Sequence, residues 1–408
     1  MLSVEAARAK VIEIVDERAG ARQTETVDFA REPSRALGRV LAENIAADRN
    51  YPPFDRSIRD GFAARAADVA HPGAKLRLVG ESRAGVAFGR AVGPGECVRI
   101  FTGAPVPRGA NAVLMQEYAR AEDGFVIFEK SAHPGQHYVA EGAESRVGEV
   151  VVTRGTRLGF AELAMAAEVG RIRVAVSRRP RVAILSTGDE VVEVEQAPGP
   201  HQIRNSNSIA LSAQVTLAGG DPAVLKNAPD DISELRARIQ QGLQADMLVL
   251  SGGVSVGEYD LVEQALRELG GEFFFDAVAL RPGKPAVFGW CGGKPVFGLP
   301  GNPVSTMLTF ELFAVPAIEL LSGYRPRPLP FFRAKLAHPV NEKGDVQHFL
   351  PARVNWPDGQ PTVELMLWEG SGDVAAVVRG NCFLVVEQSK LHLDAGEWVN
   401  VLPRRGSF

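Results

Sequence analysis

Three glycine-containing loops hold most of the residues that could bind a ligand. Each loop follows a short apolar run: ILSTGDE covers 184–190, VLSGGVSVGEYD covers 249–260, and FGLPGNPVS covers 297–305. Glycine lets a backbone approach a ligand closely, and free N–H groups at a helix start favour anions. Glycine and aspartate are also ordinary in tight strand-to-helix turns, but three such loops together predict a phosphate or nucleotide pocket. The candidate binding residues are Ser251, Gly252, Gly253, Ser255 and Gly257 in the second loop and Pro300, Gly301, Asn302 and Ser305 in the third.

Acidic residues accompany these loops, although carboxylates repel phosphate. Glu190, Asp230 and Asp260 fall on or near the same predicted edge, and Asp60 lies in a separate β-rich region. Mg²⁺ is commonly held by one or two carboxylates together with substrate oxygens and water. We therefore expect a magnesium site with Asp260, Glu190 and Asp230 as its candidate ligands. Helix capping is the alternative role for Asp260, and equally for Asp230 and its neighbour Asp231.

A short basic loop, Arg281-Pro-Gly-Lys284-Pro, could receive an oxyanion. Its prolines and glycine form a stiff loop, so two cations would be presented without much ordering cost. A surface β-turn is the alternative structure for this loop. The chain contains neither a P-loop motif nor GxGxxG, and an ordinary NTPase or dinucleotide-binding site is therefore not expected.

The elements that position these loops alternate between strand and helix. Between 177 and 325, the runs VAIL, DMLVL and PVFGL predict strands, and the stretches that follow them have helical patterns. This alternation predicts an α/β domain with a mostly parallel sheet, in which ligands bind at the carboxyl ends of the strands. Residues 1–50 and 141–176 predict a segmented helical domain, 51–140 an inserted antiparallel β domain, and 326–408 a small β domain. The predicted fold class is multidomain α/β.

Composition excludes several classes of protein. With 408 residues, of which 45% are apolar and 23% charged, the chain is expected to fold into several domains. The formal net charge of −4 argues against nucleic-acid binding. No apolar run is expected to provide the roughly 20 residues of a membrane span. Three widely spaced cysteines without a CxxC motif predict neither a disulfide framework nor structural zinc, and the cytoplasm is the expected compartment.

Several motifs resemble those of the molybdopterin molybdenumtransferase family. They are FDRSIRDGFA at 54–63, FTGAPVPRGANAVLMQE at 101–117, STGDEVV at 186–192, SGGVSVGEYD, RPGKP, LPGNPVS and GNCFLVVE at 380–387. The resemblance implies a molybdopterin-binding α/β domain with three layers and a C-terminal β barrel. It also implies that adenylylated molybdopterin and molybdate are converted to molybdenum cofactor and AMP with Mg²⁺.

The resemblance also suggests which residues contribute to the site. It places Asp60 and Thr102 on the β-domain side, and Glu190, Asp230 and Asp260 on the α/β side. The catalytic candidates are thus Asp260, Glu190, Asp60 and Thr102, and the oxyanion and phosphate candidates are Arg281, Lys284, Ser305, Arg353 and Ser371. The implied assembly is a homodimer whose cleft is completed by the partner's β domain. Molybdopterin adenylyltransferase and molybdoenzymes are the other implied partners.

Four positions depart from the family pattern. Arg59 precedes the expected acid, Glu144 replaces an aspartate, Ala277 replaces a frequent basic residue, and Pro351 stands where an arginine is common. Together the departures remove positive charge from where molybdate and pterin would bind. The alternative function is therefore a diverged paralogue that carries molybdopterin or its nucleotide without efficient metal insertion. A scaffold role and a nucleotide pyrophosphatase activity are less favoured, the second because of the DGFA and FTGAP motifs.

Overall fold

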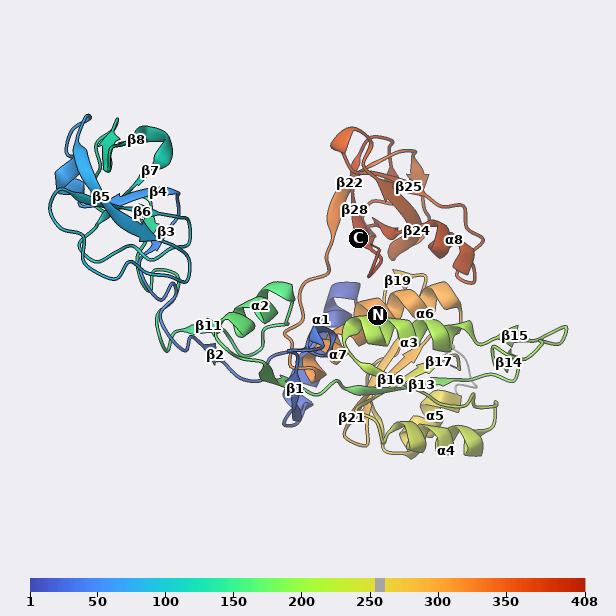
Figure 1. Cartoon of the computed structure of the whole chain (residues 1–408). Helices are drawn as coiled ribbons and strands as arrows, with labels where there is room; N and C mark the ends of the chain where they lie inside the picture. The colour runs from blue at the N-terminus through green and yellow to red at the C-terminus, as the bar shows by residue number, and fades with distance from the viewer. Residues whose placement is uncertain (254–260, 408) are drawn as a thin grey trace.

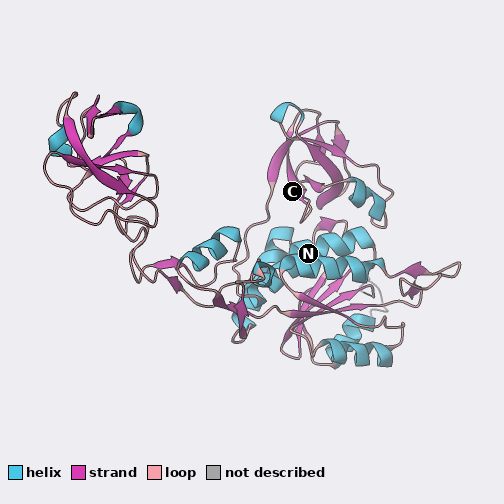
Figure 2. Ribbon diagram, in the orientation of Figure 1, coloured by secondary structure: helices cyan, strands magenta, loops and turns pink. Residues whose placement is uncertain are grey.

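The computed structural model describes residues 1–253 and 261–407 of the chain. Figure 1 shows an elongated molecule, with a β-rich lobe at one end, a central α/β body, and a second β-rich unit beside that body. The first lobe contains strands β3 to β10, and the unit beside the body contains strands β22 to β28. Figure 2 shows that most of the helices lie in the central body.

The central body is built on a six-stranded sheet with the order β16-β13-β17-β21-β20-β18. The first four strands run parallel, and β20 and β18 are antiparallel to their neighbours. The strands are β13 (Arg181–Ser186), β16 (Asp221–Val224), β17 (Met247–Ser251), β18 (Glu272–Phe275), β20 (Val287–Cys291) and β21 (Lys294–Leu299). The mostly parallel sheet confirms the predicted fold class.

Helices cover both faces of this sheet, because alternate strand residues point to opposite faces. One face packs on α3 (Ser206–Ala218) and α6 (Pro303–Thr309), and the other on α4 (Ile232–Gly242) and α5 (Leu261–Glu268). The first face is formed by Val182, Ile184, Met247 and Val249, and the second by Ala183, Leu185, Leu248 and Leu250. A short arm, β14 (Val191–Val192) with β15 (Ile203–Arg204), extends from the body between β13 and α3.

A continuous helical stretch runs through the core as α6, the π-helical segment η4 (Phe310–Ala314) and α7 (Val315–Leu321). By length and composition it could cross a membrane, which corrects the expectation that no such run exists. It is 83% buried inside the molecule, as in the core helix of a folded domain. Pro316 has no N–H to donate to Leu312, and Arg8 Nη1 instead donates to the Leu312 carbonyl at 3.1 Å.

The N-terminal helix α1 (Val4–Arg18) packs against α7 and shares the apolar core of the α/β body. The sequence grouped residues 1–50 with 141–176, and this grouping stays a prediction. Residues after it were predicted to be helical, and that was wrong: β1 (Thr24–Asp28) pairs with β12 (Arg173–Ser177), and β2 (Ile45–Ala46) pairs with β11 (Val150–Val152). Helix α2 (Phe160–Glu168) was expected from its sequence pattern. The other domain boundaries stay a prediction.

The inserted lobe has a six-stranded sheet with the order β7-β4-β6-β5-β9-β8. Its strands are β4 (Gly61–Ala64), β5 (Lys75–Ser82), β6 (Glu96–Ile100), β7 (Ala112–Met115), β8 (Ala119–Glu122) and β9 (Phe125–Phe128). A smaller pair, β3 (Arg56–Ser57) and β10 (Tyr138–Val139), lies beside the sheet. The prediction of an antiparallel domain was wrong for one pair, because β5 and β6 run parallel.

The C-terminal unit is a closed barrel. Strands β24, β25, β22, β28 and β26 pair in succession, and β26 pairs back onto β24. The strands are β22 (Phe332–Leu336), β24 (Gln347–Asn355), β25 (Thr362–Leu365), β26 (Cys382–Val386) and β28 (Trp398–Pro403), with the small pair β23 (Val340–Asn341) and β27 (His392–Leu393). The barrel is joined to the α/β body through β19 (Leu280–Arg281), which pairs with β24. Helix α8 (Val374–Arg379) packs against α6.

Candidate functional site

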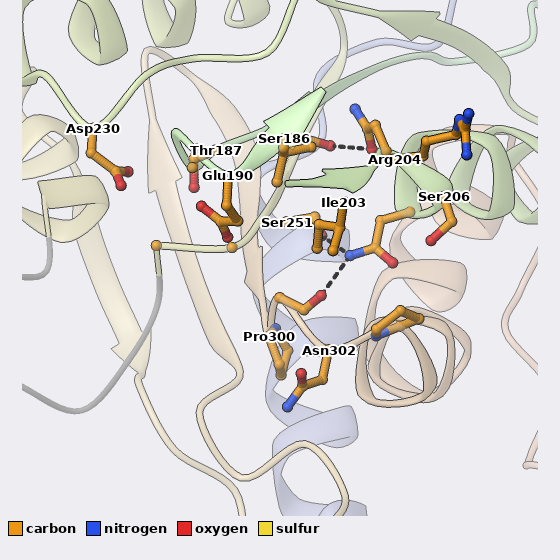
Figure 3. Close-up of a pocket in the computed structure, with 18 of the residues that line it drawn as sticks. Ser186, Thr187, Glu190, Ile203, Arg204, Ser206, Asp230, Ser251, Pro300 and Asn302 are labelled. Carbon is orange, nitrogen blue, oxygen red and sulfur yellow. Dashed lines mark hydrogen bonds between the residues drawn. The ribbon is translucent and has the colours of Figure 1, made fainter. Parts of the chain in front are cut away.

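A cavity of about 620 Å³ lies at the carboxyl ends of β13, β17 and β21. All three predicted glycine loops contribute residues to it, as Figure 3 shows. Its lining includes Ser186, Thr187, Gly188 and Glu190 after β13, 204–207 at the start of α3, Asp230 before α4, 251–253 after β17, and 300–303 after β21. Parallel strands therefore bring loops that are far apart in the sequence to one binding pocket.

Asn207 connects the loops that surround the cavity. Its Nδ2 donates to Ser251 Oγ and to the Gly301 carbonyl, both at 2.8 Å, and lies 3.3 Å from Thr306 Oγ1. Its Oδ1 is buried and has no partner among the described residues. One side-chain amide thus fixes the ends of β17 and β21 relative to α3, and it does so from within the cavity wall.

The helix that carries Asn207 begins at a capping asparagine. Asn205 Oδ1 accepts from the Ser208 N–H at 3.0 Å, which satisfies one free donor of the first turn of α3. The same oxygen accepts from Ser186 Oγ at 3.0 Å, at the end of β13. Because Asn205 is 4% exposed, this bridge between strand and helix is shielded from water. The cap therefore aligns α3 with the strand-end loop.

Two glycines allow the loops to meet closely. Gly252 has φ +94°, and a Cβ there would lie 2.9 Å from the Thr187 carbonyl oxygen. A Cβ on Gly301 would lie 3.5 Å from the Gly252 Cα, so the loops after β17 and β21 are in near contact. Side chains are excluded from this part of the wall, which leaves backbone groups to face a ligand.

Two of the predicted acids line the cavity. In the view of Figure 3, Asp230 and Glu190 lie on the side where Thr187 is found, away from Asn302. Asp231 has a different role: its carboxylate accepts from the N–H groups of Ser233 and Glu234 and caps α4, as the alternative interpretation proposed. A hydrogen bond from the Ser233 hydroxyl, helped by these N–H groups, lowers the pKa of Asp231.

The two lining carboxylates suit a magnesium ion better than a protein-only metal site. Across 1–253 and 261–407, no group of three or more His, Cys, Asp or Glu residues could hold a metal. Mg²⁺ does not require such a cage, because it takes one or two carboxylates and completes its shell with phosphate oxygens and water. Glu190 and Asp230, which line one cavity, fit that donor set.

The predicted cations do not line this cavity. Arg281 is exposed and pairs through its backbone with His348 of the barrel, and Lys284 is exposed. Between them, Gly283 has φ +114°, and a Cβ there would lie 2.5 Å from Thr309 Cγ2. Pro285, the residue after Lys284, does reach the cavity wall. The loop is therefore held at the edge of the pocket, with its cations outside the described lining.

The remaining phosphate candidates are also outside the lining. Ser305 is 3% exposed and lies inside α6, behind the wall. Ser371 belongs to the barrel unit and accepts from Asn302 Nδ2 at 2.8 Å, while its carbonyl accepts from the Val304 N–H at 2.9 Å. Arg353 is an exposed residue of β24, opposite Glu364 of β25. Of these three, Ser371 has a defined structural role, because it fixes the loop after β21.

Asp60 and Thr102 lie together, but in the inserted lobe. Asp60 Oδ1 accepts from the backbone N–H and from the hydroxyl of Thr102, both at 2.7 Å. These two bonds, the backbone one first, lower the pKa of Asp60. The lobe extends away from the α/β body in Figure 1, so one chain does not bring this pair to the cavity.

Ser255, Gly257 and Asp260 lie outside the described residues. Conversely, several residues of the wall were missed by the sequence interpretation. These are Ser186, Thr187, Arg204, Asn205, Ser206 and Asn207. The polar run Arg204-Asn-Ser-Asn207 at the start of a predicted helix was the available signal. Arg204 is the one cation in the described part of the lining. Its Nε donates to the Val194 and Gln196 carbonyls of the arm.

Comparisons with known proteins assign a family. Residues 2–170 match the MoeA N-terminal region (domain I and II), 183–320 a probable molybdopterin binding domain, and 333–403 the MoeA C-terminal region (domain IV). A molybdopterin molybdenumtransferase of Bacillus subtilis (strain 168) is 33% identical, with 93% of this chain and 90% of the relative covered. One of Haemophilus influenzae is 34% identical, with 99% and 98% covered.

Solved structures agree with the sequence relatives. The molybdopterin biosynthesis moeA protein of Pyrococcus horikoshii OT3 has a TM-score of 0.81 and 27% identity, and the comparison covers 99% of this chain and 100% of that one. Another structure of a molybdopterin biosynthesis moea protein from this organism has a TM-score of 0.77 and 32% identity, with 99% of both chains covered. The chain therefore belongs to the molybdopterin molybdenumtransferase family, which is a family of transferases.

Proposed function

We propose that this chain inserts molybdenum into adenylylated molybdopterin and releases AMP. The observation that carries the proposal is the cavity at which three strand-end loops converge, with two carboxylates in its wall. A volume of about 620 Å³ is within the usual range for a small-molecule site. Two substrates meet in this reaction: the nucleotide-linked pterin and molybdate.

Backbone groups and small side chains would bind the phosphates. The close approach of Gly252 and Gly301 presents main chain rather than side chains to the ligand. Ser251 and Asn302 flank these glycines, and both are already held in place, Ser251 by Asn207 and Asn302 by Ser371. Because these contacts exist before a ligand arrives, little ordering would be needed on binding.

The proposed reaction needs no oxidant or reductant, because it consists of a hydrolysis and an exchange of molybdenum ligands. Water attacks the phosphoanhydride, the P–O bond to the adenylate breaks, and AMP leaves while the terminal phosphate remains on the pterin. The two thiols of the pterin bind molybdenum, and their protons leave with one molybdate oxygen as water. Mg²⁺ bound at Glu190 and Asp230 would neutralise charge on the phosphate oxygens.

We also propose that the working form is a homodimer in which the partner's inserted lobe completes the cavity. The Asp60–Thr102 pair supports this, because its exposed carboxylate lies in a lobe that extends away from the pocket of its own chain. The proposed partners are a molybdopterin adenylyltransferase, which would supply the substrate, and molybdoenzymes, which would receive the cofactor. The proposed compartment is the cytoplasm, and the three cysteines are free and buried.

A pair of neighbouring acids offers the sharpest test. Asp230 lines the cavity, whereas Asp231 caps α4 and is the matched control. With adenylylated molybdopterin and molybdate, D230N should need a roughly tenfold or higher Mg²⁺ concentration for half-maximal AMP release. D231N retains a capping side chain and should behave as the native protein does.

The same experiment separates the carrier function from transfer. If the native chain binds the nucleotide but releases no AMP, the transferase proposal fails and a carrier role replaces it. If D230N and D231N require the same Mg²⁺ concentration as the native chain, Asp230 is not a metal ligand. Ala277→Lys should improve molybdate use if lost positive charge limits the reaction, and an unchanged rate would remove that explanation.

A further inference from the structure

A second cavity, rich in arginine, lies where the central body, the linker before the barrel (322–331) and the C-terminal tail meet. The core helix of that body is the continuous stretch of α6, η4 and α7. Its volume is about 200 Å³. The charged residues of its lining come from five separate parts of the chain. They are Arg8 of α1, Arg157, Glu311 and Glu319 of the core helix, Arg327 of the linker, and Arg405 near the C-terminus. Four cations and two acids give this lining an excess of positive charge.

Glu319 is the unusual member of this set. It is 7% exposed and lines both this cavity and a smaller one next to it, where Arg39 and Arg179 are the other charged groups besides Arg157. Within the described parts of the chain, its carboxylate makes no hydrogen bond and no ion pair, although four arginines line the cavity with it. A buried carboxylate without donors is costly unless it is protonated or meets a ligand. Burial raises the pKa of Glu319, and Arg405, Arg8 and Arg157 oppose that shift.

Most of the arginines already have protein partners. Arg405 binds both carboxylate oxygens of Glu311, with contacts of 2.8–3.2 Å. Arg8 donates to the carbonyls of Leu312 and Arg327, at 3.1 and 2.6 Å. Glu311 compensates the charge of Arg405. The contacts of Arg8 hold its guanidinium group in position and leave its charge uncompensated, because a carbonyl carries no net charge.

Two further arginines complete the wall. Arg157 donates to the Gly38 and Ala218 carbonyls at 3.2 and 3.3 Å. The Arg157 and Arg327 guanidinium groups lie 5.6 and 5.3 Å from the centre of the Tyr324 ring. Arg327 makes no side-chain hydrogen bond or ion pair with the described residues, so its donors are available to a ligand.

We propose that this cavity binds a small, doubly charged oxyanion, at the junction of α1, the core helix, the linker and the C-terminal tail. The excess of arginine attracts an anion, the donors of Arg327 face it, and Glu319 in its protonated form donates to it. A cationic ligand would meet four guanidinium groups. The site is separate from the strand-end cavity and does not depend on the proposed transferase reaction.

Sulfate is a suitable probe, because it keeps its double charge across the pH range in which Glu319 would titrate. Calorimetric titration of the native chain with sulfate should detect binding. R327Q should weaken this binding about tenfold, since a charge-assisted contact is lost. R325Q is the matched control, because Arg325 is an exposed arginine of the same linker that does not line the cavity. Any sulfate that binds in the strand-end cavity would add the same heat to the titrations of R325Q and R327Q, so it would not produce a difference between them.

Glu319 gives a second readout. Sulfate affinity of the native chain should rise as pH falls from neutrality into the range where the Glu319 carboxyl takes up a proton, because that proton removes a negative charge from the cavity. E319Q should remove this pH dependence and bind sulfate more tightly at the higher pH. The proposal is overturned if sulfate does not bind, if R325Q and R327Q lose affinity equally, or if E319Q keeps the native pH dependence.

Discussion

At the scale of single residues, Asn207 is the side chain that holds the candidate site together. Its amide donates to Ser251 and Gly301, from the loops after β17 and β21. Asn207→Ala should raise the concentration of adenylylated molybdopterin needed for half-maximal AMP release about tenfold, and lower the free energy of unfolding by about 1–3 kcal/mol. Asn207→Asp should be worse, because it turns a carboxylate oxygen toward two acceptors. Thr216→Ala is the control, because Thr216 is an exposed residue of the same helix outside the cavity lining. An Asn207→Ala enzyme with native kinetics would contradict this role.

Gly252 tests whether the backbone itself forms the phosphate site. Gly252→Ala would combine a strained φ of +94° with a Cβ 2.9 Å from the Thr187 carbonyl oxygen. Gly124→Ala is the control, since Gly124 has φ +79° but no atom within 4 Å of its Cβ position. Gly124→Ala should lose about 1–2 kcal/mol of stability from its strained φ, Gly252→Ala should lose more because of the added contact with Thr187, and substrate binding should weaken only in Gly252→Ala. Equal binding by the two variants would show that the loop does not touch the ligand.

Individual site residues were predictable where their type is unusual for their position. Glycine is ordinary in a single strand-to-helix turn, but three such loops together predicted a pocket, and Gly252 and Gly301 do line the cavity. Asn207 was missed because a polar run at a helix start is also the ordinary capping pattern. Its function depends on where β17 and β21 end relative to α3, and only the packed sheet fixes that relationship. Arg281 and Lys284 lie outside the lining because the bend at Gly283 packs against Thr309.

At the scale of elements, the inserted lobe contains a pH-sensitive junction between strands. Glu96 of β6 accepts from Arg90 at 2.7 Å, from the Gly93 N–H at 3.1 Å and from Arg77 of β5 at 2.7 Å. These contacts, Arg90 first, lower the pKa of Glu96 to about 2, from 4.5. A lowered carboxyl pKa means that the stabilisation is present above the unfolded value and is lost as pH falls toward the folded one.

The lobe should therefore lose stability between about pH 4.5 and about pH 2. Hydrogen exchange of the 61–128 region at several pH values would measure this change. Glu96→Gln should be less stable at neutral pH and less sensitive to acid in that window. If the variant and the native chain lose protection in parallel, other carboxylates control the acid response.

Helices and strands with a strong hydrophobic pattern were predicted well, and strands that pair with segments far away in the sequence were not. Strands β13, β17 and β21 are apolar on both faces, as expected when helices cover both sides of a parallel sheet. Residues 24–28 were expected to be helical, but they form β1 because β12, far along the chain, offers a pairing edge. The parallel pair of β5 and β6 likewise depends on tertiary structure rather than on the local pattern.

At the scale of the whole molecule, the separation of the inserted lobe from the cavity makes a prediction about assembly. Asp60→Ala and Asp230→Ala should each be inactive alone if both residues serve one site. Mixed dimers would then contain one intact site, built from the native lobe of one chain and the native cavity of the other. Random mixing should restore about a quarter of the native activity. If no activity returns although both variants form dimers, the site belongs to a single chain.

Molybdenum transfer and AMP release are the activity that we propose for the strand-end cavity. The most direct measurement incubates the purified chain with adenylylated molybdopterin, molybdate and Mg²⁺, and follows AMP and molybdenum cofactor together over time. Both products should appear in equal amounts, and omission of Mg²⁺ should stop AMP release. A nucleotide that stays bound and intact, with no AMP and no cofactor formed, would contradict it.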